Sequence, residues 1–85
     1  MVGQTMFWIY VLKSEKYDKS YVGSTNDLTR RLSQHNAGLG NFTKNYRPWN
    51  MIYTEEFETH TEALQREKFL KSKSGRKFLK SVVFI

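Results

Sequence analysis

This sequence contains five side chains of the types that phosphodiester hydrolysis requires. They are Tyr10, Tyr21, Arg31, His35 and Glu67. A phenol or an imidazole can take a proton from water, a guanidinium can neutralise charge on a phosphate, and a carboxylate can hold a divalent metal ion. Together they indicate a nuclease, although each residue also has an ordinary structural interpretation.

The two tyrosines belong to short motifs on a predicted hairpin. Residues 7–12 are aromatic, β-branched and apolar at both alternating sets of positions, which predicts a central strand covered on both faces. A polar turn then leads into a second strand at Tyr21, and a register with Tyr10 opposite Tyr21 is one possibility. Gly23 follows on the same face as Tyr21, and a glycine there would leave space for a phosphate. The alternative is that both tyrosines are packing residues.

Arg31 and His35 lie one turn apart on a predicted helix. Asn26 is a suitable N-cap, and the helix is expected over 27–37. Both side chains flank its apolar stripe, and a guanidinium fork suits phosphate because it donates two parallel hydrogen bonds. Alternatively, Arg31 pairs with Asp27 and His35 is a hydrogen-bonded histidine near the end of the helix.

Glu67 falls on the apolar face of a second predicted helix, over 60–73. A carboxylate in that position needs a partner, and one carboxylate suffices for magnesium, which keeps most of its waters. The alternative is a surface ion pair with Lys71 at i+4, worth a few tenths of a kcal/mol. Gly75 is expected to break the helical pattern before a short final helix over 76–83.

The segment between these helices contains a predicted third strand over 51–57 and, before it, a long loop over 38–50. The loop interleaves aromatic residues with the cations Lys44 and Arg47. This pattern suits stacking on bases and contact with backbone phosphates. The same aromatics would equally well fold back as a plug over a small core.

Composition narrows the class of protein. Eighty-five residues predict one domain, 1–85, and the absence of cysteine is compatible with a reducing cytoplasm. No segment approaches a membrane span or a signal peptide, so we expect a cytoplasmic protein without a membrane partner. A net charge of +6 and a pI of about 9.7 favour a polyanionic partner, with nucleic acid foremost.

The order and spacing of these residues resemble the GIY-YIG nuclease superfamily, in particular its small stand-alone members. The first motif corresponds to Trp8-Ile9-Tyr10 and the second to Tyr21-Val22-Gly23, and the match extends over about 6–73. The resemblance implies an α+β fold in which a three-stranded antiparallel sheet is flanked by helices. Two departures are visible: Trp8 replaces the glycine that opens the first motif, and no asparagine follows the glutamate helix.

The resemblance also implies the chemistry. One Mg²⁺ or Mn²⁺ ion would be held by Glu67, Tyr10 would help to activate water, and Arg31 would stabilise charge on the phosphate. Tyr21 and His35 would position water or phosphate. The residues expected to contact nucleic acid are Gly23, Thr25, Lys44, Arg47, Arg66 and Lys71.

The resulting hypothesis is a metal-dependent endonuclease that cleaves DNA, one strand per catalytic event, in repair or processing. A stand-alone domain leaves room for a protein partner that supplies specificity. One rival is a non-catalytic nucleic-acid-binding module on the same scaffold, and a second is a protein-interaction adaptor. Affinity for DNA that falls steeply with salt would distinguish a phosphate-binding protein from the adaptor.

Overall fold

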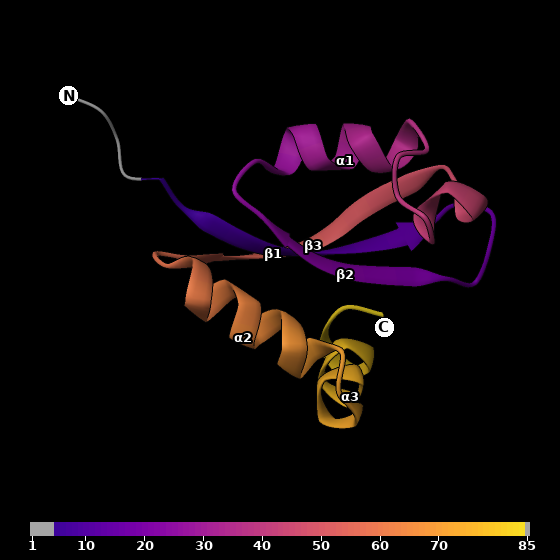
Figure 1. Cartoon of the computed structure of the whole chain (residues 1–85). Coiled ribbons are helices and arrows are strands. Elements are labelled where there is room, and N and C mark those ends of the chain that lie inside the picture. Colours follow the sequence, from indigo (N-terminus) through magenta and orange to yellow (C-terminus); the bar gives the residue numbers. More distant parts are fainter. Residues whose placement is uncertain (1–4, 85) are drawn as a thin grey trace.

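The computed structural model describes residues 5–84 and contains a three-stranded antiparallel sheet. β1 (Phe7–Ser14) lies between β2 (Ser20–Thr25) and β3 (Trp49–Phe57). One helix covers one face of the sheet, and two helices cover the other (Figure 1). The predicted α+β architecture is therefore confirmed.

The hairpin register differs from the possibility considered above. Tyr10 pairs with Gly23, and Tyr21 pairs with Leu12. The connecting loop is closed by a hydrogen bond from Ser14 N to Lys19 O (3.0 Å), and this closure sets the pairing two residues away from a Tyr10–Tyr21 match. Because side chains alternate between faces with a period of two, both tyrosines still lie on the same face of the sheet.

Helix α1 (Leu28–Asn36) begins one residue later than expected. Thr25 Oγ1 accepts a hydrogen bond from the Asp27 N–H, and the Asp27 carboxylate in turn accepts one from Arg30 N at 3.0 Å. Asp27, and not Asn26, is therefore the N-cap. The chain then passes through a short 3₁₀ helix, η1 (Thr43–Tyr46), before it enters β3.

The C-terminal helices divide at a different place from the prediction. Helix α2 (His60–Leu70) is shorter than expected, and α3 (Lys73–Val82) starts before Gly75. Ser72 caps α3 by accepting a hydrogen bond from Gly75 N. A side chain at Gly75 would overlap the backbone of Phe69 and Leu70, so this glycine permits close contact between the two helices where we expected it to break the pattern.

Two apolar clusters lie on opposite faces of β1. Ile9 and Val11 pack against α2 and α3, whereas Tyr10 and Leu12 pack beneath α1 and the loop before β3. The four side chains are at most 1% exposed, which confirms a central strand covered on both faces. β3 begins two residues before the strand predicted over 51–57, so Trp49, 2% exposed, joins the second cluster as a strand residue. From the long loop itself, Tyr46 packs against this cluster.

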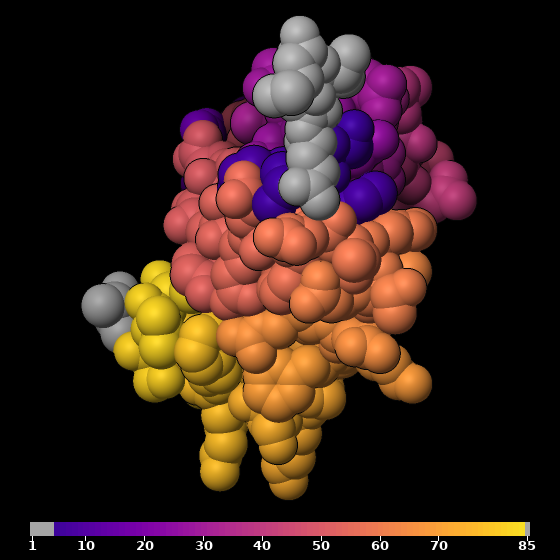
Figure 2. Space-filling view, turned by 90° about the vertical axis from the view of Figure 1, so that its left-hand side faces the viewer, coloured from indigo at the N-terminus to yellow at the C-terminus, as the bar shows by residue number. Residues whose placement is uncertain are grey.

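The helices α2 and α3 form a continuous layer below the strands in the space-filling view (Figure 2). None of the helices within residues 5–84 is long and apolar enough to cross a membrane.

Candidate active site

Tyr10, Arg31 and His35 meet beneath α1. The Arg31 Nε–H donates to Tyr10 Oη at 3.3 Å, and Tyr10 Oη lies 2.8 Å from His35 Nε2. The Tyr21 ring centre lies 5.0 Å from that of His35 and 6.3 Å from that of Tyr10. Four of the five predicted catalytic residues therefore form one cluster, drawn from β1, β2 and α1.

His35 is buried within the cluster. Its ring is 1% exposed, and its second nitrogen, Nδ1, lies 2.8 Å from Thr43 Oγ1. Burial, followed by the charge of Arg31, lowers the pKa of His35 to about 4. The imidazole is therefore neutral near pH 7, with one ring nitrogen protonated and the other free to accept a hydrogen bond.

Burial and the hydrogen bond from Arg31 shift the pKa of Tyr10 in opposite directions. Burial raises the pKa of Tyr10 to about 12, although the hydrogen bond from Arg31 opposes the rise. The phenol is consequently protonated near neutral pH. The pKa of Arg31 is lowered by burial but raised more strongly by its hydrogen bond to Tyr10 and the neighbouring phenols, so the guanidinium stays charged.

Gly23 gives the Tyr10 ring its space. A Cβ at this position would lie 2.5 Å from Tyr10 Oη and 3.0 Å from the Tyr21 ring. The structure thus supplies a packing reason for this glycine, in addition to the predicted approach of a phosphate. Any larger residue would displace the phenol that is central to the cluster.

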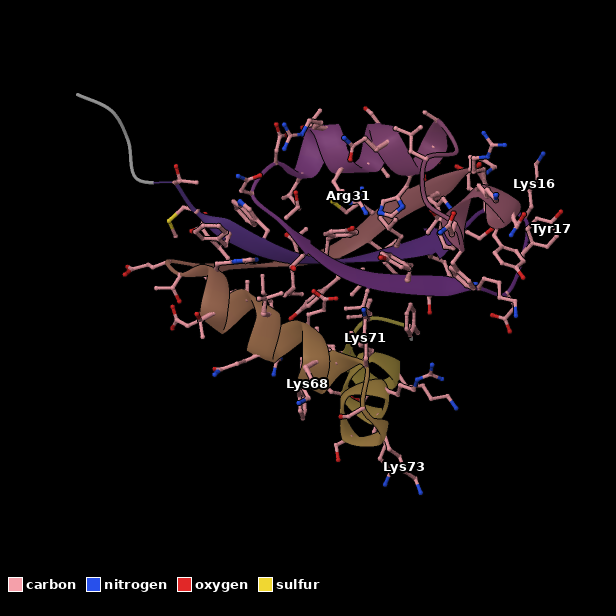
Figure 3. The ribbon with its side chains drawn as sticks, in the orientation of Figure 1. Lys16, Tyr17, Arg31, Lys68, Lys71 and Lys73 are labelled. Atoms are coloured by element: carbon pink, nitrogen blue, oxygen red, sulfur yellow. The ribbon has the colours of Figure 1, made fainter. Side chains whose placement is uncertain are left out.

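Glu67 approaches the cluster from the other side of the sheet. Its side chain is 19% exposed and forms an ion pair with Lys71, whose Nζ lies 2.7 Å from Glu67 Oε2. Lys71 Nζ also lies 5.7 Å from the centre of the Tyr21 ring. Figure 3 shows Arg31 approaching the sheet from α1 and Lys71 approaching it from the end of α2. The pKa of Tyr10 is also raised by the negative charge of Glu67, which places the carboxylate within electrostatic reach of the phenol.

Arg66 has a structural role within the protein. Its Nε and Nη2 donate to the two carboxylate oxygens of Glu55 at 2.7 and 3.0 Å, and its guanidinium lies 5.0 Å from the ring centres of both Phe69 and Phe78. The Tyr53 hydroxyl also donates to Glu55. Because both carboxylate oxygens of Glu55 and two aromatic rings engage its guanidinium, Arg66 ties β3 to α2 and α3. Its contact with nucleic acid stays a prediction.

The remaining predicted contact residues lie apart from the cluster. Lys44 and Arg47 are exposed in the loop before β3, where Arg47 Nε donates to Lys44 O at 3.0 Å. Thr25 uses its hydroxyl to turn the chain into α1. The structure brings none of these three into the group formed by Tyr10 and its partners.

Comparisons with known proteins identify the family of this chain. Residues 6–80 match the GIY-YIG catalytic domain. The chain belongs to the GIY-YIG family. This GIY-YIG domain is 40% identical over 76 residues to a UPF0213 protein of Staphylococcus saprophyticus, covering 88% of this chain and 92% of the relative. It is 41% identical to the UPF0213 protein YazA of Bacillus subtilis, covering 82% and 71%.

A solved structure extends the likeness to the fold. The solution NMR structure of a UPF0213 protein from Bacillus halodurans has a TM-score of 0.54 and 28% identity, and the match covers 91% of this GIY-YIG domain and 84% of that chain. The printed names of these relatives state no activity.

Two residues of the site were missed in the sequence. Thr43 orients the His35 ring, and Gln34 Oε1 accepts a hydrogen bond from Arg31 Nη1 at 2.9 Å. Gln34 could have been found, because residues three apart on a helix are neighbours. Thr43 carries no such signal, since its contact depends on how the loop returns to the helix.

The pKa of His35 predicts how stability of the GIY-YIG domain depends on pH. A histidine whose pKa falls on folding binds protons more readily in the unfolded chain, so stability is lost as pH falls below the unfolded value. From pKa values of about 6.5 and about 4, the loss between pH 7 and pH 5 is about 2 kcal/mol. We expect denaturant titrations to show this loss in the wild type and in His60→Gln, an exposed-histidine control. A His35→Gln variant with the same pH dependence as the wild type would contradict the assignment.

Proposed function

We propose that this GIY-YIG domain is a divalent-metal-dependent endonuclease that hydrolyses phosphodiester bonds in DNA. The observation that carries the proposal is the hydrogen-bonded cluster of Tyr10, His35 and Arg31, faced by the carboxylate of Glu67. The cluster thereby offers a proton acceptor beside a permanent cation, and Glu67 is near enough for its charge to raise the pKa of Tyr10. A cytoplasmic location and a protein partner that supplies specificity remain predictions.

The first step assigned to the protein is removal of a proton from the attacking water. Tyr10, with a pKa of about 12, is a weak proton donor on its own. The neutral imidazole of His35, 2.8 Å away, offers an acceptor for the hydroxyl proton of Tyr10. We assign Tyr10 the role of taking a proton from water while it passes its own proton to His35 Nε2. We assign the proton of the neutral ring to Nδ1, where Thr43 Oγ1, 2.8 Å away, would accept it, so that Nε2 stays free for this task.

We assign Arg31 the role of stabilising the negative charge that develops on the phosphate. Its Nε–H is directed to Tyr10 and one Nη1–H to Gln34, which fixes the plane of the guanidinium. The guanidinium fork has further N–H groups that can donate to phosphate oxygens. A bound phosphate would also offset the positive charge that lowers the pKa of His35, which makes the imidazole a better proton acceptor when substrate is present.

The donor chemistry of the site fits Mg²⁺ or Mn²⁺. Within residues 5–84, no group of three or more His, Cys, Asp or Glu side chains lies close enough to form a full ligand set. Glu67 provides one hard oxygen ligand, and magnesium usually keeps several waters beside one or two carboxylates and substrate phosphate. When bound, the ion would supply Lewis-acid stabilisation of the phosphate. The role of Lys71 would then change, because its ion pair with Glu67 must open for the carboxylate to serve as a ligand.

A non-catalytic nucleic-acid-binding module is the second candidate. The basic composition supports it equally, with a net charge of +6. The buried Tyr10–His35–Thr43 chain does not follow from that role, because phosphate binding requires cations and not a neutral imidazole enclosed behind a phenol. We therefore favour the nuclease.

Arg31→Lys tests the guanidinium within this proposal. Lysine keeps the charge but loses the fork and the hydrogen bond to Tyr10. One charge-assisted hydrogen bond is worth about 1.5 kcal/mol, so the single-turnover cleavage rate should fall about tenfold. DNA affinity should change less. Arg30→Lys, on the exposed side of the same helix, is the matched control. Equal cleavage rates for Arg31→Lys and the wild type would show that Arg31 contributes only its positive charge.

A further inference from the structure

An open groove runs along the outer edge of β2, between this strand and α3. Its volume is about 660 Å³. Its lining includes Tyr21 and Lys71 beside the candidate active site, Asp18 in the turn that precedes β2, and Ser20 at the start of β2. Since β2 is an edge strand, no neighbouring strand covers this side of the sheet. The groove adjoins the candidate active site, because Tyr21 contacts His35 and Lys71 pairs with Glu67.

The lining of the groove is positively charged. Lys71, Arg76 and Lys80 contribute cations, and the last two have no ion-pair partner within the part of the chain that the structure describes. Asp18 is the acidic residue in the lining, and its carboxylate already pairs with Lys13 at 3.2 Å. An anionic ligand would thus meet unpaired cations along one wall.

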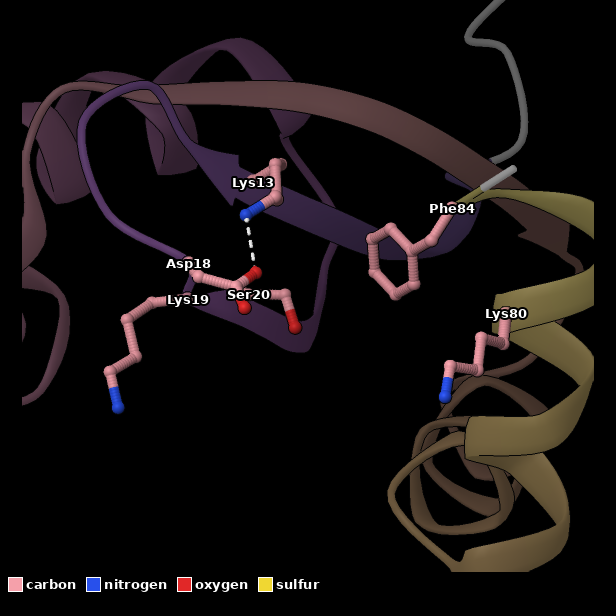
Figure 4. Close-up of a pocket in the computed structure, with 6 residues that line it drawn as sticks. All are labelled: Lys13, Asp18, Lys19, Ser20, Lys80 and Phe84. Atoms are coloured by element: carbon pink, nitrogen blue, oxygen red, sulfur yellow. Dashed lines mark hydrogen bonds and ion pairs between the residues drawn. The ribbon is translucent and has the colours of Figure 1, made fainter.

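Aromatic rings share the lining of the groove with these cations. Tyr21, Phe42 and Phe84 line the groove. Figure 4 shows its far end, where the Phe84 ring and Lys80 lie across from Ser20, and where a second hollow of about 350 Å³ is also bordered by Lys19. Rings interleaved with cations suit a nucleic-acid strand, because sugars or bases can stack while the phosphates meet the charges.

We propose that this groove binds the nucleic-acid strand on one side of the phosphate that is cleaved. Arg76 and Lys80 contact backbone phosphates, and Phe84 packs against a sugar or base. The inference rests on the proposed function, since that function places the cleaved phosphate beside Tyr21. It adds a directional element: the strand leaves the site along β2 toward the turn between β1 and β2, so that one flank of the substrate is held and the other is not.

The test compares two pairs of lysine and arginine residues on the same helix. Arg76→Gln with Lys80→Gln removes two charges from the groove, whereas Lys73→Gln with Lys77→Gln removes two charges from α3 positions that do not line it. Figure 3 shows Lys73 directed away from the sheet. All four residues are exposed, so both double variants should fold, which thermal melting will verify.

Affinity is measured by fluorescence anisotropy in chelator, in the Glu67→Gln background, with a labelled DNA oligonucleotide that is shortened in turn from either end. Removing the two groove contacts should weaken binding about tenfold and reduce the slope of log K against log salt by about 2, whereas the control pair changes neither appreciably. Shortening the oligonucleotide at one end should weaken the control protein but have little effect on the groove variant.

Equal weakening by the two double variants would show diffuse attraction only and would overturn the inference. Loss of affinity for polyglutamate, with DNA affinity retained, would make the groove a docking site for acidic protein segments and would also overturn it. Because binding is measured without cleavage, the result is separate from the proposed function: an active wild type with an unused groove contradicts this inference alone, whereas a functional groove on a protein that never cleaves contradicts the nuclease.

Discussion

Glu67→Gln is expected to abolish metal-dependent cleavage while it leaves the fold and the affinity for DNA largely intact. The amide has nearly the same shape as the carboxylate but loses the negative charge that a divalent ion requires. The structural cost is small, because the interaction lost is a partly exposed i,i+4 ion pair with Lys71, worth a few tenths of a kcal/mol.

The measurement is single-turnover cleavage with saturating protein, alongside melting temperature and DNA affinity. Glu58→Gln, at an exposed acid before α2, is the matched control and should cleave at the wild-type rate. Undiminished turnover of Glu67→Gln would show that the carboxylate has no role in cleavage. Unfolding of the variant would assign Glu67 to stability instead.

Tyr10→Phe should lower the single-turnover cleavage rate by about 10²-fold or more, the scale of general acid–base assistance. The ring stays packed between β1 and α1, but the hydroxyl that links Arg31 to His35 is lost. Burial of this link makes a structural effect inevitable too: leaving His35 Nε2 without its partner costs about 1 kcal/mol, or roughly 4–8 °C in melting temperature.

The two effects are separated by temperature and by a control. Cleavage is measured well below the melting transition, and Tyr17→Phe removes a hydroxyl from a tyrosine that is 50% exposed and distant from His35. Tyr21→Phe should also slow cleavage, through lost positioning of water or phosphate. If Tyr10→Phe and Tyr21→Phe both cleaved at the wild-type rate, the tyrosines would be packing residues and the binding module would be the better hypothesis.

The sequence predicted those features that depend on local pattern. Alternation placed Tyr10 and Tyr21 on one face even though the pairing was offset by two residues, because an even offset preserves the face. Helical spacing placed Arg31 and His35 together beneath the same helix. The family resemblance supplied the position of Glu67, whose local setting suggested a surface pair with Lys71 equally well.

Features that depend on tertiary closure could not be predicted. Thr43 reaches His35 only because the loop returns over α1. Arg66 donates hydrogen bonds to Glu55 because β3 and α2 lie side by side. The sequence therefore predicted Arg66 and Lys71 alike as contacts for nucleic acid. In the structure Arg66 is tied to Glu55 and Lys71 pairs with Glu67, whereas the groove cations Arg76 and Lys80 have no ion-pair partner within residues 5–84.

The most direct test of the nuclease assignment is cleavage by the wild-type protein of a panel of labelled duplex, branched and single-stranded DNA and RNA, in Mg²⁺, Mn²⁺ or chelator. We predict that at least one DNA substrate is cut in Mg²⁺ or Mn²⁺, that chelator stops the reaction, and that Glu67→Gln does not cut it. Binding of these substrates without cleavage in either metal, or cleavage that persists in chelator, would contradict it.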